Sequence, residues 1–355
     1  MKASILLLPG DGIGPEVVAA AEQVLRAIAA RFGHDFQLTT AVIGGAALKS
    51  GQPPLPDATL DAARRADAIL LGAVGDPSFD NSPPAERPEA ALLKIRRELG
   101  LYANLRPARV WPGLENAGPL KPEVLAGTDL LIFRELTGGL YYGQPRGISE
   151  DGDSAHNTMR YSRAEVSRIA RRAFEAARLR RNKVASVDKA NVLETSRLWR
   201  QVVTDTARDF PDVVLEHMLV DTCAMKIAYA PSSFDVVLTE NMFGDILSDE
   251  AGAVVGSLGL LPSASLGDGA GLYEPVHGSA PDIAGRNAAN PIGTIASAAM
   301  LLRHSLGLEN EAGHVERAIE HALAAGIRTA DLAAGGPSVG TTQMTAAILE
   351  GLDAA

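Results

Sequence analysis

Short apolar segments alternate along the chain with longer segments in which apolar residues recur at helical spacing. Most of the short segments are rich in Val, Ile or Leu, a composition typical of strands that are buried on both faces. We predict strands at Ser4–Leu8, Ala68–Leu71, Asp129–Arg134, Lys183–Val187, Val213–Val220 and Phe234–Thr239. We predict helices at about Pro15–Arg31, Pro88–Glu98, Arg163–Arg178, Glu194–Arg208, Asp245–Leu258, Ile292–Leu306 and His314–Ala325. The alternation of strands and helices indicates an α/β fold.

The length and composition limit the class of protein. A chain of 355 residues is long enough for two domains. With 46% hydrophobic and 21% charged residues it can bury a large core, which excludes a disordered or fibrous protein. The net charge of −10 argues against nucleic acid as the main partner, although it leaves room for a locally positive pocket.

The cysteine content and the length of the apolar runs indicate the cellular compartment. Cys223 is the only cysteine, so an intrachain disulfide is impossible and a reducing compartment is favoured. No apolar run approaches the roughly 20 residues that a membrane-spanning helix needs. The few apolar residues before Pro9 are too short for a signal peptide and are typical of a buried strand. We therefore expect a cytoplasmic protein with no membrane partner.

A glycine-rich segment, Gly10–Glu16, follows the first predicted strand and precedes the first predicted helix. The third glycine of a dinucleotide-binding loop would fall at position 15, which is Pro15. The spacing therefore argues against a Rossmann fold. The segment also lacks the lysine of a phosphate-binding P-loop. A tight strand-to-helix turn is the simpler interpretation.

Two aspartates, Asp245 and Asp249, are four residues apart and share one face of a predicted helix. Their like charges repel each other, so the pair favours a bound cation. Carboxylate oxygens suit a hard divalent ion such as Mg²⁺ or Mn²⁺. Asp221, at the end of the predicted strand Val213–Val220, is a possible third ligand. The alternative is a solvated acidic face, but the residues around the pair are apolar.

Three arginines lie in contexts that suit carboxylate binding. Arg106 precedes a proline, which forces an extended backbone, and Arg134 ends a predicted strand. An arginine fork binds a carboxylate through charged hydrogen bonds, so several arginines suit a dicarboxylate. Any one of them could instead form a structural salt bridge. The third arginine shares one face of the helix Pro88–Glu98 with an acid and two leucines: Glu89, Leu92, Leu93 and Arg96.

Two further side chains could move protons. Lys189 follows the predicted strand Lys183–Val187, and a desolvated lysine can transfer protons at neutral pH. Its alternative is an ordinary surface lysine. Tyr141 lies in a glycine-flanked segment, Gly139–Gly143, and is a possible proton donor. Its alternative is a packing aromatic.

Taken together, these segments resemble the β-decarboxylating dehydrogenases of 2-hydroxy acids, a family that includes isocitrate, isopropylmalate and tartrate dehydrogenases. The resemblance extends from about Gly10 to Gly340. Each matching segment alone is weak evidence for the family, but the occurrence of all of them in the same order is highly specific. The matching segments are Asn104–Pro107, Arg134–Gly139, Ser186–Asn191, Phe243–Asp249 and Glu274–Gly285.

The resemblance implies a two-domain α/β fold that is not a Rossmann fold. Residues 1–101 and 256–355 would form a cofactor-side domain that holds both termini. Residues 102–255 would form a central domain with the dimer interface and much of the substrate and metal site. The resemblance also implies a homodimer with shared active sites, in which Lys189 and Asp221 are supplied by the partner chain.

The resemblance also implies roles for individual residues. Tyr141 and Lys189 would be the catalytic acid–base pair. Asp221, Asp245 and Asp249 would bind Mg²⁺ or Mn²⁺, with Asp221 also near the substrate. The substrate-binding residues would be Arg96, Arg106, Arg134, Asp221, Leu92 and Leu93.

The cofactor implied by the resemblance is NAD. Asp282 matches the position that accepts the adenosine ribose hydroxyls, and a carboxylate there would repel the 2′-phosphate of NADP. Asn290 would lie near the adenine. The full set of expected cofactor-binding residues is Glu89, His277, Gly278, Ser279, Ala280, Asp282, Ile283 and Asn290.

The leucine pair bears on the substrate. On the family pattern, Leu92 and Leu93 face the substituent at C3, and two leucines suit the isopropyl group of 3-isopropylmalate. Oxidative decarboxylation of that substrate would yield 4-methyl-2-oxopentanoate, in leucine biosynthesis. The alternatives are a tartrate, malate or homoisocitrate substrate, with both leucines belonging to the core. Leu219, Thr222 and Cys223 depart from the family pattern, but none of them removes a charged group.

Overall fold

The computed structural model describes residues 1–354 and divides into two compact units. Unit 1 comprises Met1–Leu101, Trp111–Pro119 and Gly256–Ala355, and unit 2 comprises Tyr102–Val110 and Leu120–Val255. The expected central domain, 102–255, included the segment Trp111–Pro119, which the structure places in unit 1. The reason is local packing: Trp111 is buried, and Arg328 donates a hydrogen bond of 2.7 Å to the carbonyl of Gly113.

The sheet of unit 1 has a central strand that is buried along its whole length, β3 (Ala68–Ala73). Its strands follow the order β2-β1-β3-β12-β11. All neighbours pair in parallel except β11 and β12, which are antiparallel. The other strands are β1 (Lys2–Gly10), β2 (Asp35–Thr40), β11 (Pro262–Leu266) and β12 (Gly271–Pro275).

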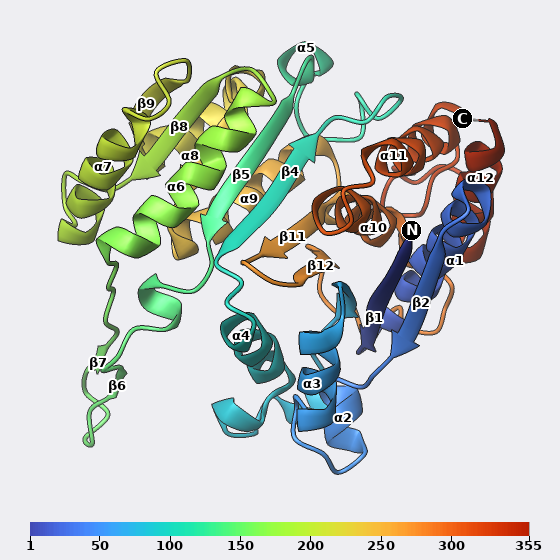
Figure 1. The fold of residues 1–355 in the computed structure, drawn as a ribbon, viewed down its shortest axis with the longest axis horizontal. Coiled ribbons are helices and arrows are strands. Elements are labelled where there is room, and N and C mark those ends of the chain that lie inside the picture. Colours follow the sequence, from blue (N-terminus) through green and yellow to red (C-terminus); the bar gives the residue numbers. More distant parts are fainter. Residues whose placement is uncertain (355) are drawn as a thin grey trace. The chain divides into compact units, whose positions relative to one another are not determined.

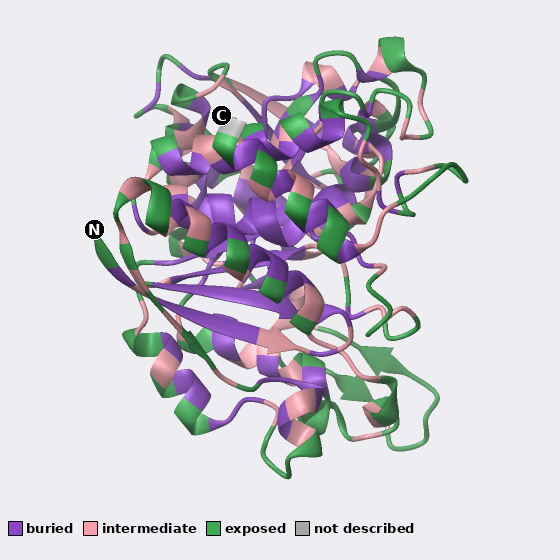
Figure 2. Cartoon of the chain, turned by 90° about the vertical axis from the view of Figure 1, so that its right-hand side faces the viewer, coloured by how far each residue is buried: buried purple, intermediate pink, exposed green. Residues whose placement is uncertain are grey.

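Helices cover both faces of this sheet, as a strand of six buried residues requires (Figures 1 and 2). One face packs against α1, α10 and their neighbours, and the other against a cluster that includes Leu6, Leu71 and Ile95. The helices are α1 (Gly14–Phe32), α2 (Gly45–Lys49), α3 (Asp57–Arg65), α4 (Pro88–Glu98), α10 (Ile292–His304), α11 (Glu309–Ala324) and α12 (Thr341–Ala354).

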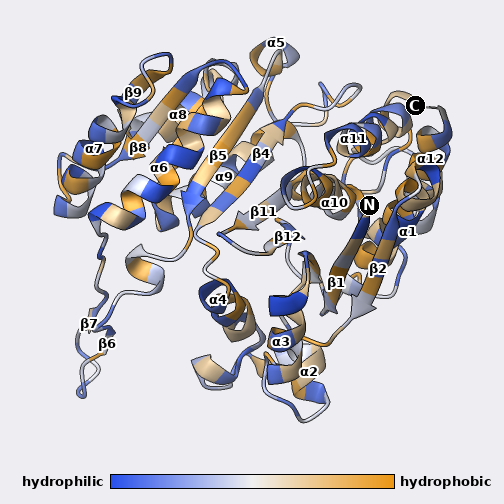
Figure 3. Cartoon of the chain, in the orientation of Figure 1, coloured by the Kyte–Doolittle hydropathy of each residue, from blue (hydrophilic) through white to orange (hydrophobic). Residues whose placement is uncertain are grey.

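The sheet of unit 2 follows the order β4-β5-β10-β8-β9. Strand β4 is antiparallel to β5, and the remaining pairs are parallel. The middle of strand β5 is apolar, whereas α6 packs its apolar residues inward and presents polar residues to solvent (Figure 3). The strands are β4 (Ala103–Arg109), β5 (Asp129–Glu135), β8 (Lys183–Asp188), β9 (Val214–Leu219) and β10 (Val236–Thr239).

Helices α6 and α7 pack together on this sheet, and α8 packs against α9, which contacts β4 and β5. A short two-stranded ribbon, β6 (Gly147–Ile148) with β7 (Ala155–His156), is exposed on both strands (Figure 2). The helices are α5 (Pro122–Leu125), α6 (Arg163–Arg178), α7 (Glu194–Ala207), α8 (Val220–Tyr229) and α9 (Asn241–Val255).

The predicted α/β class is confirmed, and every predicted strand and helix has a counterpart, with boundaries shifted by a few residues. One shift affects a site residue. Strand β9 ends at Leu219, and Val220 begins α8, so Asp221 lies in the first turn of a helix rather than at the end of a strand. A carboxylate is favoured in that turn by the positive end of the helix dipole. No helix in the described part of the chain is long and apolar enough to cross a membrane.

Candidate active site

Two arginines and two aspartates form a cluster in unit 2. Arg106 and Arg134 lie on the neighbouring strands β4 and β5, and Asp245 and Asp249 lie one turn apart on α9, which packs on those strands. Arg134 Nη1 lies 2.5 Å from Asp245 Oδ1, and Arg106 Nη1 lies 3.3 Å from Asp249 Oδ1. Gly244 allows this approach, because a Cβ there would lie 2.7 Å from the Arg134 side chain.

Tyr141 joins the same cluster from the short 3-10 helix Gly139–Tyr141, which follows β5. Its hydroxyl donates a hydrogen bond to Asp245 Oδ2, and the guanidinium of Arg134 lies 5.3 Å from the centre of its ring. Burial, together with the hydrogen bond to Asp245, raises the pKa of the Tyr141 phenol. The phenol therefore stays protonated at neutral pH, as a proton donor must.

Asp245 and Asp249 have the chemistry of a divalent-cation site. Both are partly exposed, with 33% and 59% of their side chains accessible, so a cation can reach them. Burial raises the pKa of Asp249, and the nearby charge of Asp245 raises it further, while Arg106 opposes the shift. A cation between the two carboxylates would relieve that repulsion. Their oxygen donors fit Mg²⁺ or Mn²⁺.

Lys189 and Asp221 form a separate pair in unit 2. Lys189 follows β8, its backbone N–H donates to Ser196 Oγ, and its Nζ lies 2.6 Å from Asp221 Oδ1. The hydrogen bond from Lys189 lowers the pKa of Asp221. Among the described residues of this one chain, Asp221, Asp245 and Asp249 do not come together as a three-ligand metal group.

Arg96, on α4 of unit 1, is buried and pairs with Glu274 of β12. Its Nη2 lies 2.6 Å from Glu274 Oε1, and both side chains are about nine-tenths buried. Its Nε is buried and has no hydrogen-bond partner in the described structure. A buried donor left unsatisfied costs about 1–3 kcal/mol, so this nitrogen favours an added acceptor such as a carboxylate.

The two leucines of α4 differ in their surroundings. Leu92 is partly buried and packs against the apolar cluster that contains Ala91 and Ile95. Leu93 is partly buried as well but is not part of that cluster. Leu92 therefore belongs in part to the hydrophobic core, which was the alternative role expected for both leucines. Leu93 is the better candidate for contact with a substrate side chain.

Several residues expected to bind the cofactor come together in unit 1. A Cβ at Gly75 would lie 3.2 Å from Ser279 Oγ and 3.3 Å from Glu89 Oε1, so these three residues surround one position. Burial lowers the pKa of His277, which is therefore neutral near pH 7. The remaining members follow β12: Gly278 and Asp282 are exposed, Ala280 and Ile283 are partly buried, and Asn290 is buried.

The segment Gly10–Glu16 forms the tight turn that its glycines predict. Gly10 and Gly12 have φ angles of +70° and +57°, and a Cβ at Gly12 would lie 1.9 Å from the carbonyl oxygen of Ser279. The backbone N–H of Ile13 donates to that same carbonyl at 2.8 Å. The turn thus packs directly against the expected cofactor residues, although it is not itself a dinucleotide-binding loop.

Asp11, within this turn, is a structural residue that the sequence analysis did not single out. It is 6% exposed, and its carboxylate accepts hydrogen bonds from the backbone N–H groups of Gly45, Ala46 and Gly75 at 2.7–2.9 Å. Asp11 therefore joins the loops after β1, β2 and β3. In the sequence, Asp11 appears only as an acidic residue inside a glycine-rich turn. A single sequence does not reveal that it contacts Gly45 and Gly75, which lie 34 and 64 positions away.

Replacing Asp11 by Ala is expected to destabilise the protein by roughly 2–4 kcal/mol, because buried N–H groups lose a charged acceptor. The KM for the cofactor expected from the sequence should rise as well, since Gly75 and Ser279 are positioned by the same turn. Denaturant unfolding and cofactor titration measure the two effects. The matched control is Asp67→Ala, which removes an exposed acceptor of the Ser4 N–H. Equal unfolding midpoints for the two variants would contradict this role.

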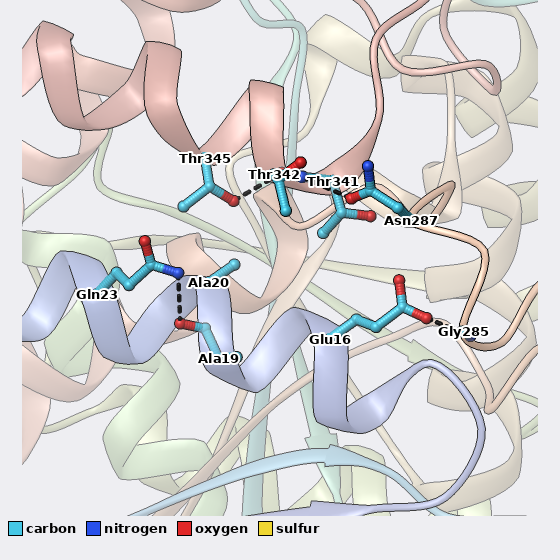
Figure 4. A pocket seen from close by; sticks show the side chains of 9 residues that line it. All are labelled: Glu16, Ala19, Ala20, Gln23, Gly285, Asn287, Thr341, Thr342 and Thr345. Atoms are coloured by element: carbon cyan, nitrogen blue, oxygen red, sulfur yellow. Dashed lines mark hydrogen bonds between the residues drawn. The ribbon is translucent and has the colours of Figure 1, made fainter.

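A pocket of about 350 Å³ lies in unit 1 between α1, α12 and the loop that contains Gly285 and Asn287 (Figure 4). None of the expected site residues lines it. The buried hydroxyls of Thr341 and Thr345 donate to the backbone carbonyls of Ala289 and Thr341. They therefore do not call for a ligand, and the pocket is separate from the candidate active site.

Comparisons with known proteins agree over nearly the whole chain. The family model for isocitrate/isopropylmalate dehydrogenase matches residues 4–348. Curated relatives named 3-isopropylmalate dehydrogenase include those of Priestia megaterium (57% identity, covering 98% of this chain and 95% of the relative) and Aquifex aeolicus (55%, 99% and 98%). The relative from Bacillus subtilis is 58% identical over 94% of this chain and 92% of its own.

Solved structures of isocitrate dehydrogenase and of a β-decarboxylating dehydrogenase are also similar to this chain over nearly its whole length. Isocitrate dehydrogenase from Methylococcus capsulatus has a TM-score of 0.88 at 38% identity, covering 99% of both chains. A β-decarboxylating dehydrogenase from Thermococcus kodakarensis has a TM-score of 0.83 at 36% identity, covering 99% of this chain and 96% of its own. Fold and relatives together define an oxidoreductase. The chain belongs to the isocitrate/isopropylmalate dehydrogenase family, which confirms the resemblance found in the sequence.

Proposed function

We propose that this chain catalyses the NAD-dependent oxidative decarboxylation of 3-isopropylmalate to 4-methyl-2-oxopentanoate, a reaction of leucine biosynthesis. The observation that carries the proposal is the set of curated relatives with that name at 55–58% identity. Their matches cover more than nine-tenths of this chain and of each relative. The partly exposed Leu93 beside Arg96 adds an apolar contact for an isopropyl group.

The arginines would bind the substrate carboxylates. Arg106 and Arg134 are held close together by α9, and Arg96 has a buried Nε that lacks a partner in the described structure. Guanidinium groups bind carboxylates through paired, charged hydrogen bonds. Fixed arginines also orient the substrate, so that the bond to be broken lies in one defined position.

Lys189 and Tyr141 would move the protons. Lys189 takes the proton of the C2 hydroxyl as the hydride leaves C2, and the substrate becomes a 2-oxo acid. After the β-carboxylate leaves as CO₂, Tyr141 donates its phenolic proton to C3, and its raised pKa keeps that proton in place until then. When bound, a divalent cation supplies the positive charge that lowers the pKa of the C2 hydroxyl, and NAD accepts the hydride.

Specific residues would hold the metal and the cofactor. Asp221, Asp245 and Asp249 would hold Mg²⁺ or Mn²⁺, consistent with the oxygen donors that these ions prefer. NAD would bind the unit 1 residues around Ser279. The exposed carboxylate of Asp282 would select NAD over NADP by repelling a 2′-phosphate.

The proposal includes a homodimer in the cytoplasm. Among the described residues of one chain, Asp221 does not form a ligand group with Asp245 and Asp249. A second copy of the chain would therefore complete the three-carboxylate site. Cys223 is buried and unpaired by disulfide, which suits a reducing compartment.

A kinetic panel tests the proposal. We expect 3-isopropylmalate with NAD and Mn²⁺ to give the highest kcat/KM among 3-isopropylmalate, isocitrate, malate, tartrate and homoisocitrate. Its preference over malate should be about 10–200-fold, the range that one apolar pocket provides. NADP should be a poor cofactor, and chelation of the metal should abolish turnover with every substrate. A higher kcat/KM for malate or isocitrate would overturn the substrate assignment.

A further inference from the structure

Each arginine of the unit 2 cluster is held at its Nε by an asparagine side chain. Arg106 Nε donates to Asn104 Oδ1 at 2.9 Å, and Arg134 Nε donates to Asn241 Oδ1 at 2.9 Å. Both asparagines are buried, with exposed fractions of 0% and 1%. Neither belongs to the site residues expected from the sequence, yet both contact an expected substrate arginine directly.

The two asparagines reach the arginines from different elements. Asn104 lies two residues before Arg106 on β4, so the two side chains share one face of the strand. Asn241 is the first residue of α9, and it bonds to Arg134 on β5. The same arrangement thus occurs twice on separate scaffolds, which indicates a shared requirement of the two arginines.

Asn241 also holds the segment that carries Tyr141. Its Nδ2 donates to the carbonyl oxygens of Leu136 and Gly138, each at 3.1 Å. One carboxamide therefore fixes both Arg134 and the chain leading to Tyr141. An aspartate could accept from Arg134, but its second oxygen would face two carbonyl oxygens and repel them.

Three structural arginines in the same unit use a different partner. The Nε atoms of Arg178, Arg180 and Arg200 all donate to aspartates, at 2.8 Å in each case. A carboxylate neutralises the guanidinium, whereas a carboxamide fixes its orientation without adding negative charge. Each cluster arginine is thus fixed without being neutralised at its Nε, as Arg172 also is by the hydroxyl of Tyr102 at 2.7 Å.

The charge of the cluster explains the difference. The charges of Arg106 and Arg134 offset those of Asp245 and Asp249, so a divalent cation that also binds Asp221 would leave a net positive charge. That excess attracts a dicarboxylate substrate. A carboxylate in place of either asparagine would offset one arginine charge and weaken the attraction.

We propose that Asn104 and Asn241 are positioning residues that orient Arg106 and Arg134 through their Nε atoms while preserving the arginine charge for a substrate dicarboxylate. The inference rests on the proposed function, because it requires the arginine cluster to bind the substrate carboxylates. Asn104 acts on binding alone, whereas Asn241 acts on binding and on the placement of Tyr141.

The test uses the full-length protein with Asn104→Asp and Asn241→Asp, which keep side-chain size and add one negative charge. We expect the Kd of 3-isopropylmalate, measured by calorimetry with Mn²⁺, and its KM to rise on the order of tenfold to a hundredfold, the effect of one charge-assisted contact. The KM for NAD should stay unchanged in both variants. The kcat should fall only in Asn241→Asp.

The control variant is Asn287→Asp, which makes the same chemical change in unit 1, where the asparagine Oδ1 accepts the Thr342 N–H. Its Kd and KM for 3-isopropylmalate should match those of the wild type. Unchanged substrate affinity in Asn104→Asp would overturn the inference. So would loss of folding in both cluster variants, or an equal rise in the KM for NAD, because either result indicates a purely structural role.

Failure of the wild type to bind or oxidise 3-isopropylmalate is a different result, since it removes the proposed substrate. The same variants would then be compared on the dicarboxylate that the wild type oxidises best. A rise in the KM for that substrate in Asn104→Asp supports the inference, and an unchanged KM overturns it.

Discussion

Replacing Tyr141 by Phe is expected to lower kcat by about 10²–10⁴-fold, the usual contribution of a positioned general acid. The substitution removes one oxygen, while the ring keeps its position beside the guanidinium of Arg134. The hydroxyl contacts Asp245, and burial raises its pKa, so the wild-type phenol is protonated at neutral pH, as the proposed proton donor must be. Substrate KM should change little, because the arginines proposed to bind the carboxylates remain.

The measurement separates the two halves of the reaction. NADH formation and CO₂ release are followed in a single turnover, and CO₂ release or protonation of C3 should be the slowed step in Tyr141→Phe. Tyr142→Phe is the matched control, since it removes the same atom one residue further along the chain and should keep near wild-type kcat. Unchanged turnover in Tyr141→Phe, with its fold intact, would exclude this tyrosine from the mechanism.

The sequence predicted the strands with the most apolar composition and missed the polar ones. Strand β3 is buried throughout, and its run of Ile and Leu identifies it directly. Strand β4 contains an asparagine, two arginines and a proline, a composition that is unusual for a buried strand. It forms because β5 pairs with it and because its polar side chains find partners, such as Asn104 with Arg106. These partners are tertiary and leave no periodic pattern.

The candidate site shows the same division. Asp245 and Asp249 could be placed on one helix face from their spacing, because that relation is local. The hydrogen bond between Arg134 and Asn241 joins residues 107 positions apart, and no local pattern could reveal it. Asp11 was missed for the same reason, since its three backbone partners lie on two distant loops. Site residues related by local spacing could therefore be predicted, whereas the long-range hydrogen bonds that orient their side chains could not.

A heterodimer that combines a Lys189→Met subunit with a Tyr141→Phe subunit is expected to recover about half of the wild-type activity, if the dimer is two-fold symmetric with shared sites. Each homodimeric variant should lose on the order of a hundredfold or more in kcat. In the heterodimer, one of the two sites pairs the wild-type lysine of one subunit with the wild-type tyrosine of the other. The second site carries both substitutions and should be inactive.

The structure gives a physical reason for this expectation. Within one chain, Lys189 pairs with Asp221 at 2.6 Å, while Tyr141 contacts Asp245. In the described residues, the three aspartates do not form one metal-binding group. Under the proposed function, a single chain thus carries two partial sites, one with the lysine and one with the tyrosine. A second copy would bring the lysine pair of one chain to the tyrosine cluster of the other.

Co-expression with two different affinity tags and sequential purification isolates the heterodimer for this measurement. The control combines Lys189→Met with Asp221→Asn, which lie in the same partial site. Both sites of that heterodimer contain one defect, so its activity should stay near that of the inactive homodimers. No recovery in the Lys189→Met and Tyr141→Phe pair would show that each chain completes its own site. Recovery in the control would show that Lys189 and Asp221 of one chain serve different sites. Recovery only in the heterodimer of Lys189→Met with Tyr141→Phe would establish that Lys189 and Tyr141 act across the dimer. A site within one chain would always contain one of the two substitutions.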